Sequence, residues 1–101
     1  MQINISARHG TISEATREKI TKKVEKLERF HDRVTAIDVT VDLEPRENPV
    51  LDVQIHTEPK HEFVVKTQAG ELFISLDDAI HKLEQQLKKH KEKIISAHRG
   101  E

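Results

Sequence analysis

The chain contains no cysteine, no tryptophan and no tyrosine, and three phenylalanines are its only residues of the Phe, Tyr and Trp class. Without cysteine there is no disulfide, no thiol nucleophile and no cysteine-based zinc site. Three glycines in total provide no glycine-rich loop of the kind that cradles phosphates. The scarcity of aromatic side chains also argues against a protein that stacks single-stranded bases on exposed rings.

Long apolar runs are also missing, so no segment is expected to span a membrane. Residues 1–5 (Met-Gln-Ile-Asn-Ile) have neither the basic segment nor the apolar core of a secretion signal. These absences predict a cytoplasmic protein. A length of 101 residues, with no repeat and no linker, predicts a single domain over residues 1–101.

The overall charge is nearly balanced, with 17 Lys and Arg against 18 Asp and Glu and a net charge of −1. This balance by itself predicts neither a nucleic-acid partner nor an acidic one. Any electrostatic function must therefore depend on where the charges lie.

Two periodicities divide the chain into strands and helices. Alternating apolar residues predict strands, and apolar residues at helical spacing predict helices, the first of them beginning after Ser13 as N-cap. The expected strands are residues 2–8, 34–44, 51–56 and about 61–67, and the expected helices run from 14 to about 31 and from about 72 to 96. The order β-α-β-β-β-α predicts an α+β fold in which two helices pack on one face of a four-stranded, mainly antiparallel sheet.

The other face of this sheet should contact water and carry acidic side chains. Its expected residues are Asp38, Asp42, Glu44, Asp52 and Glu62, with Lys66 nearly alone against them. A nucleic acid should avoid such a face.

The second expected helix sorts its residues by face. At about 100° per residue, it has one apolar stripe with a polar and basic flank beside it. The stripe holds Leu76, Ile80, Leu83, Leu87 and Ile94, and the flank holds Lys82, Gln86, Lys89 and Lys93. Lysines repeated along a rigid helix are spaced to follow a phosphate backbone, although an ordinary solvated face has the same composition.

Charge is segregated on the first expected helix as well. The cations Lys19, Lys22, Lys23, Lys26 and Arg29 fall within about a third of its circumference, and Glu14, Glu18, Glu25 and Glu28 occupy the opposite flank. Because both helices are expected on one side of the sheet, we expect their basic flanks to form one positive surface. Lysine rows without exposed aromatic rings favour recognition of folded RNA by shape and backbone.

No motif predicts a metal site, a cofactor or catalysis. The seven histidines include no pair at metal-ligand spacing on a helix: His81 and His90 point to different faces, and His56 and His61 flank a turn. The acidic face is flat, without a sign of a pocket that would raise a carboxyl pKa for acid–base work. We therefore expect no enzyme, no metal, no cofactor and no small-molecule substrate.

Three stretches, in the β-α-β-β-β-α order, resemble one known family: the ribosome hibernation-promoting factors of the HPF/YfiA group, also called the sigma-54 modulation family. The stretches are Ser13 to Phe30, with Lys-Leu-Glu-Arg-Phe at its end; Glu71-Leu72-Phe73; and Lys82 to Lys93. The resemblance covers essentially the whole chain, and its last stretch is the most specific.

This resemblance implies a fold like that of double-stranded-RNA-binding domains (dsRBD-like) with an added N-terminal strand. It also implies binding to the small ribosomal subunit and its rRNA near the decoding centre, in the mRNA channel and the A and P sites. The result is an inactive, protected ribosome under starvation or stress. The chain stops at Glu101, as in short members that act with a second hibernation factor, so such a factor is a further expected partner.

The resemblance also implies site residues. By position, RNA contacts are assigned to Lys22, Lys23, Lys26, Lys82, Gln86, Lys89, Lys91 and Lys93, with Arg8 as a further contact; Arg29 is added by the charge pattern. Lys91 lies off the flank derived from helical spacing. Family members often have arginine where this chain has Gln85 and tyrosine where it has Phe73. We therefore expect one weaker contact at Gln85, and one hydroxyl group is missing at Phe73.

Two other interpretations stay open. The lysine flanks can be ordinary solvated surface on a protein-interaction module, which would bind a protein with little salt dependence. Alternatively, the chain can be a general double-stranded-RNA-binding domain, which would bind arbitrary duplexes as well as ribosomes.

Overall fold

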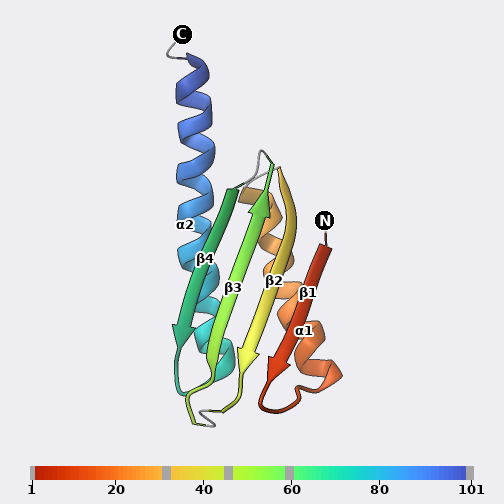
Figure 1. The fold of residues 1–101 in the computed structure, drawn as a ribbon. Helices are drawn as coiled ribbons and strands as arrows, with labels where there is room; N and C mark the ends of the chain where they lie inside the picture. Colours follow the sequence, from red (N-terminus) through yellow and green to blue (C-terminus); the bar gives the residue numbers. More distant parts are fainter. Residues whose placement is uncertain (1, 31–32, 45–46, 59–60, 100–101) are drawn as a thin grey trace.

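A four-stranded sheet, with its strands in chain order β1-β2-β3-β4, forms one layer of the structure (Figure 1). The structure is a computed structural model that describes residues 2–30, 33–44, 47–58 and 61–99, with only the backbone described for Phe30 and residues 91–99. β1 (Gln2–Arg8) pairs in parallel with β2 (Val34–Asp42), and β3 (Val50–Thr57) and β4 (His61–Gln68) continue the sheet antiparallel. The predicted α+β fold is confirmed; its second strand ends at Asp42 rather than at Glu44.

The first helix begins as the sequence predicts but ends differently. Ser13 is the N-cap of α1 (Glu14–Glu25), and its hydroxyl oxygen accepts the Thr16 N–H at 3.1 Å. The expected single helix to about His31 is wrong in its last part, because a 3-10 helix, η1 (Lys26–Phe30), follows α1. Tightening of the last turn into a 3-10 helix is a common helix ending. His31 lies outside the described residues.

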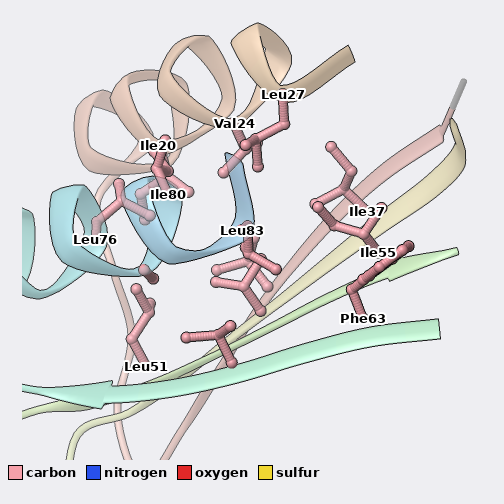
Figure 2. Close-up of a cluster of buried hydrophobic side chains, with 14 of the residues drawn as sticks. Ile20, Val24, Leu27, Ile37, Leu51, Ile55, Phe63, Leu76, Ile80 and Leu83 are labelled. Carbon is pink, nitrogen blue, oxygen red and sulfur yellow. The ribbon is translucent and has the colours of Figure 1, made fainter. Parts of the chain in front are cut away.

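Both helices cover the same face of the sheet, and the core lies between the two layers (Figures 1 and 2). Every second residue points inward along β3 and along β2 from Ile37 onward, as the alternation predicts. At the start of β2 a register shift between Val34 and Ala36 interrupts the alternation. The side chains with at most 1% exposure are Ile20, Val24, Leu27, Ile37, Val39, Val41, Leu51, Val53, Ile55, Leu76, Ala79, Leu83 and Leu87, together with the polar Ser75. The apolar stripe expected on the second helix lies in this core from Leu76 to Leu87, and the side chain of Ile94 lies outside the described residues.

The start of α2 (Leu72–Arg99) is tied to the sheet by polar groups that the sequence analysis did not identify. The Glu71 carboxylate accepts the backbone N–H groups of Phe73 and Ile74, each at 3.1 Å, and so caps the helix. The Thr67 hydroxyl donates to the Ser75 carbonyl oxygen at 2.9 Å and accepts from the Ser75 hydroxyl at 2.7 Å. These buried bonds join the end of β4 to the first turns of α2.

The C-terminal part of α2 projects beyond the end of the sheet (Figure 1). The helix has 28 residues, so at about 1.5 Å per residue it is longer than any strand beneath it. It ends at Arg99 rather than near residue 96. Among the described residues, no helix has the length and apolarity needed to cross a bilayer.

Leu83→Ala should lower the free energy of unfolding by about 2–5 kcal/mol, because it leaves a cavity at a fully buried position. Denaturant unfolding measures this change. Ile74→Ala is the matched control, because Ile74 lies on the same helix and is 63% exposed; it should change the value by no more than about 0.5 kcal/mol. Equal losses in the two variants would contradict the packing described here.

Thr67→Val should cost about 1–3 kcal/mol, because an almost isosteric change removes both hydroxyl bonds to the buried Ser75. The same unfolding experiment tests it. Thr40→Val is the control: this half-buried threonine lies on the open face, 3.5 Å from the Ser6 hydroxyl. A Thr67 variant no less stable than the control would show that the tie to α2 is unimportant.

Candidate nucleic-acid interface

The polar and basic row on α2 is presented at the surface. The side chains of Lys82, Gln86 and Lys89 are exposed, and Gln86 and Lys89 border a groove between α2 and β4. The Lys82 ammonium lies 3.2 Å from the Asp78 carboxylate one turn earlier, and both side chains are more than half exposed. Such a pair is worth at most about 1 kcal/mol, so Lys82 can exchange it for a phosphate. The side chains of Lys91 and Lys93 lie outside the described residues.

The row on α1 and η1 borders a different groove. Lys22, Lys26 and Arg29 are exposed and line a hollow that also contains Ile3 of β1. In a 3-10 helix, residues three apart lie above one another, so Arg29 follows Lys26 on the same side. Glu25 and Glu28 line the same hollow, which makes this surface more mixed in charge than the row on α2.

Two other lysines of the first helix, Lys19 and Lys23, contact the second helix. The Lys23 ammonium lies 2.7 Å from the Asp77 carboxylate of α2, and its side chain is only 27% exposed. The Lys19 ammonium lies 4.1 Å from the centre of the Phe73 ring, within the range of a cation–π contact. The sequence analysis grouped Lys23 with the RNA contacts, but the structure gives it an acidic partner within the protein.

These contacts correct the expectation of one continuous positive surface. The side of α2 that faces α1 carries Phe73 and Asp77, whereas its side toward β4 carries Gln86 and Lys89. The two basic rows therefore flank different grooves, with the contact between the helices separating them. Helical spacing places residues on a flank but does not say which neighbour that flank meets.

Arg8 lies on the open face of the sheet, away from the helices. It follows Gln2, Asn4 and Ser6 on the outward side of β1 and is the register partner of Asp42. With Lys66, Asp42 and Asp52 it lines a shallow hollow on that face. The structure thus does not bring Arg8 together with the helical lysines, and its role as an RNA contact stays a prediction.

The open face carries its expected carboxylates, but histidines partner several of them. His56 lies between Asp38 and Glu62, with ring nitrogens 2.9 Å and 3.5 Å from their carboxylate oxygens. His9 lies 2.9 Å from Asp42. The sequence analysis found no metal-ligand pair of histidines on a helix, but it did not anticipate the acidic partners of His56 and His9, which the sheet brings near.

Asp42 carries the clearest electrostatic effect among the described residues. The backbone N–H of Glu44 donates to its carboxylate at 3.0 Å and holds the pKa of Asp42 below its usual value, with the His9 ring as the next cause. His9, Asp42 and Glu44 also bring three possible metal-ligand atoms within 4.8 Å of one another. All three side chains are exposed or half-buried, and exposed groups of this kind are common without a metal, so the absence of a metal site stays a prediction.

Aromatic rings gather at the groove between β4 and α2, where the sequence analysis expected none. The rings of His61 and His90 are stacked, with centroids 4.7 Å apart and planes 24° from parallel. Phe63 lies 4.6 Å from His61 and 5.2 Å from His90, centroid to centroid. The spacing of 29 positions between the two histidines gave no local signal for this contact. Phe63 is buried, as expected of the phenylalanines, and the expectation of almost no base stacking stays a prediction.

Within the described part of the chain, every buried polar side-chain atom has a hydrogen-bond partner. No unpaired buried group therefore marks an acid–base or nucleophilic centre there. The expectation that the chain is not an enzyme stays a prediction.

Comparison with known proteins gives a consistent result over nearly the full length. Residues 3–95 match the family described as Sigma 54 modulation protein / S30EA ribosomal protein. The ribosome hibernation promoting factor of Azotobacter vinelandii is 31% identical over 101 residues, covering 100% of this chain and 92% of that protein. The protein of the same name from Escherichia coli K12 is 33% identical over 94 residues, covering 93% and 97% respectively.

Two solved structures have the same fold. A ribosomal subunit interface protein from Coxiella burnetii matches with a TM-score of 0.77 at 25% identity, covering 91% of this chain and 99% of that one. The N-terminal domain of Thermus thermophilus Protein Y matches with a TM-score of 0.78 at 25% identity, covering 89% and 99%. Sequence and fold thus agree over almost every described element, and the chain belongs to the Sigma 54 modulation protein / S30EA ribosomal protein family.

Proposed function

We propose that this protein is a ribosome hibernation factor that acts in the cytoplasm, binds the small ribosomal subunit and keeps stressed ribosomes inactive. In this proposal it contacts rRNA at the decoding region and occupies the mRNA channel and the A and P sites as a rigid plug. The observation that carries the proposal is the match over nearly the whole chain to proteins named ribosome hibernation promoting factor. A steric plug needs a firm body and a phosphate-binding surface, and it needs no catalytic group.

The α2 row supplies the main contact in this proposal. Lys82 and Lys89 are seven positions apart, which is about 10 Å along a helix, and their side chains lie on a flank that the buried stripe keeps turned outward. Each lysine that neutralises a phosphate releases counterions, so affinity should fall as salt rises. Gln86 between them adds an amide that both donates and accepts hydrogen bonds.

The row of Lys22, Lys26 and Arg29 supplies a second contact, and its interspersed glutamates make it the weaker one. Lys91, Lys93 and Arg8 remain predicted contacts. A second hibernation factor remains a predicted partner. The carboxylates of the open face are directed away from RNA in this arrangement, and a contact by Arg8 would be made at the β1 edge of that face.

Lys82→Glu combined with Lys89→Glu should abolish co-sedimentation with vacant small ribosomal subunits, because it turns the α2 row negative. Folding should be nearly unchanged, since each position is exposed. Lys66→Glu is the control for reversing the charge of one exposed lysine. Lys66 lies on the open face, and its side chain is 71% exposed. This variant should retain binding. Binding by a folded double variant would reject this surface as the contact.

The same experiment includes a salt series and an arbitrary RNA duplex. Binding should weaken steeply with salt, and the milder Lys89→Ala should reduce the slope of log affinity against log salt by about one. Equally tight binding to the duplex would favour a general double-stranded-RNA-binding domain. No ribosome binding at low salt would favour a protein-interaction module.

Lys22→Glu combined with Lys26→Glu should weaken subunit binding less than the α2 double variant, because neighbouring glutamates already dilute the positive charge of this row. Affinities of the two double variants, measured at one salt concentration, test the order. A larger loss from the α1 variant would make the first helix the principal contact.

A further inference from the structure

We propose that the groove between β4 and α2 binds one unpaired nucleobase of the contacted RNA by stacking it on the exposed ring of His61, which the His90 ring backs from the other side. This inference rests on the proposed function, because the groove adjoins the α2 row. Gln86 and Lys89 belong to both surfaces: they are part of the row, and they line the groove with His61, Phe63, Val64 and His90.

The two histidines form a prearranged stack. Their rings come from β4 and α2 and lie nearly parallel, with centroids 4.7 Å apart. Phe63 meets His90 edge-on and is only 7% exposed, so it anchors the rings to the core, where Figure 2 shows it beside Ile55. His61 is exposed and His90 is partly exposed. Imidazole is among the rings on which proteins stack unpaired RNA bases.

The rim of the groove supplies the other groups that a nucleotide requires. Lys89 provides a cation for the phosphate, and the Gln86 amide can donate to and accept from a base edge. Val64 is 48% exposed and gives an apolar wall. Glu62 is the acidic residue that lines the groove. One of its carboxylate oxygens lies 3.5 Å from His56 on the open face, so its charge is directed toward that face and not toward the stacked rings.

The size of the groove also fits a small planar ligand. Its volume is about 330 Å³, near the lower limit for small-molecule sites. β4 is an edge strand, and such an edge can also receive an extended peptide by backbone pairing. A peptide strand bound in this way has no need of stacked rings or of a lysine beside them, so the side chains favour RNA.

The first test compares His61→Ala with His61→Phe in co-sedimentation with small ribosomal subunits. Loss of one stacked base should weaken binding roughly tenfold, and the salt slope should stay unchanged because no phosphate contact is lost. His61→Phe keeps a ring and should bind within about twofold of the unmodified protein. His81→Ala is the control, since His81 is exposed on the opposite side of the same helix from His90. Thermal unfolding verifies that each variant is folded.

The pattern of losses separates this inference from the proposed function. If Lys82→Glu with Lys89→Glu abolishes binding but His61→Ala does not change it, the base site is rejected and the proposed function stands. If neither changes binding, the base site and the α2 row are both rejected as contacts. If the unmodified protein itself does not bind the small subunit at low salt, the proposed function is rejected. If His61→Phe is as weak as His61→Ala, the histidine acts through its charge or hydrogen bonds and the stacking proposal is rejected.

A cross-linking experiment identifies what occupies the groove. A benzophenone amino acid replaces Val64, which lines the groove, and the bound complex with the small subunit is irradiated. Cross-links to an unpaired rRNA nucleotide support the proposal. Cross-links to a ribosomal protein alone would overturn it and indicate a peptide on the edge of β4.

Discussion

The rotation of α2 about its own axis is the constraint on which the rest of the structure depends. Leu76, Leu83 and Leu87 are completely buried, and burying each side chain is worth about 1.5–3 kcal/mol. Turning the helix by one residue, about 100°, would expose part of this stripe and lose that energy. The Thr67–Ser75 bonds tie the helix to the end of β4 as well. The flank from Lys82 to Lys89 is therefore kept outward by the packing beneath it.

Cations on the two helices serve different purposes although their chemistry is the same. Lys19 and Lys23 lie against Phe73 and Asp77 and join α1 to α2. The exposed row on α2 makes little use of its charge inside the protein, because its one described ion pair, between Lys82 and Asp78, is solvent-exposed. Charge that stabilises the fold is thus separate from charge that remains available to a polyanion.

Charge is unevenly distributed over the molecule, although the net charge is only −1. The open face carries carboxylates with histidine partners, whereas basic rows lie on the helical layer. A body of this kind can be oriented by a polyanion even when its total charge provides no attraction. The groove beside β4 adds rings to one end of this arrangement, so that charge and stacking meet at Gln86 and Lys89.

Local patterns in the sequence determined the strands, the helices, the capping residue Ser13, the core and the two basic flanks, because period, propensity and capping act between residues close in the chain. Tertiary structure alone decided the contacts between distant segments. It placed Lys23 against Asp77 and brought His61 onto His90. Each of these depends on how one element is turned and positioned relative to another. That is settled by packing across the whole core, and no single segment carries the information.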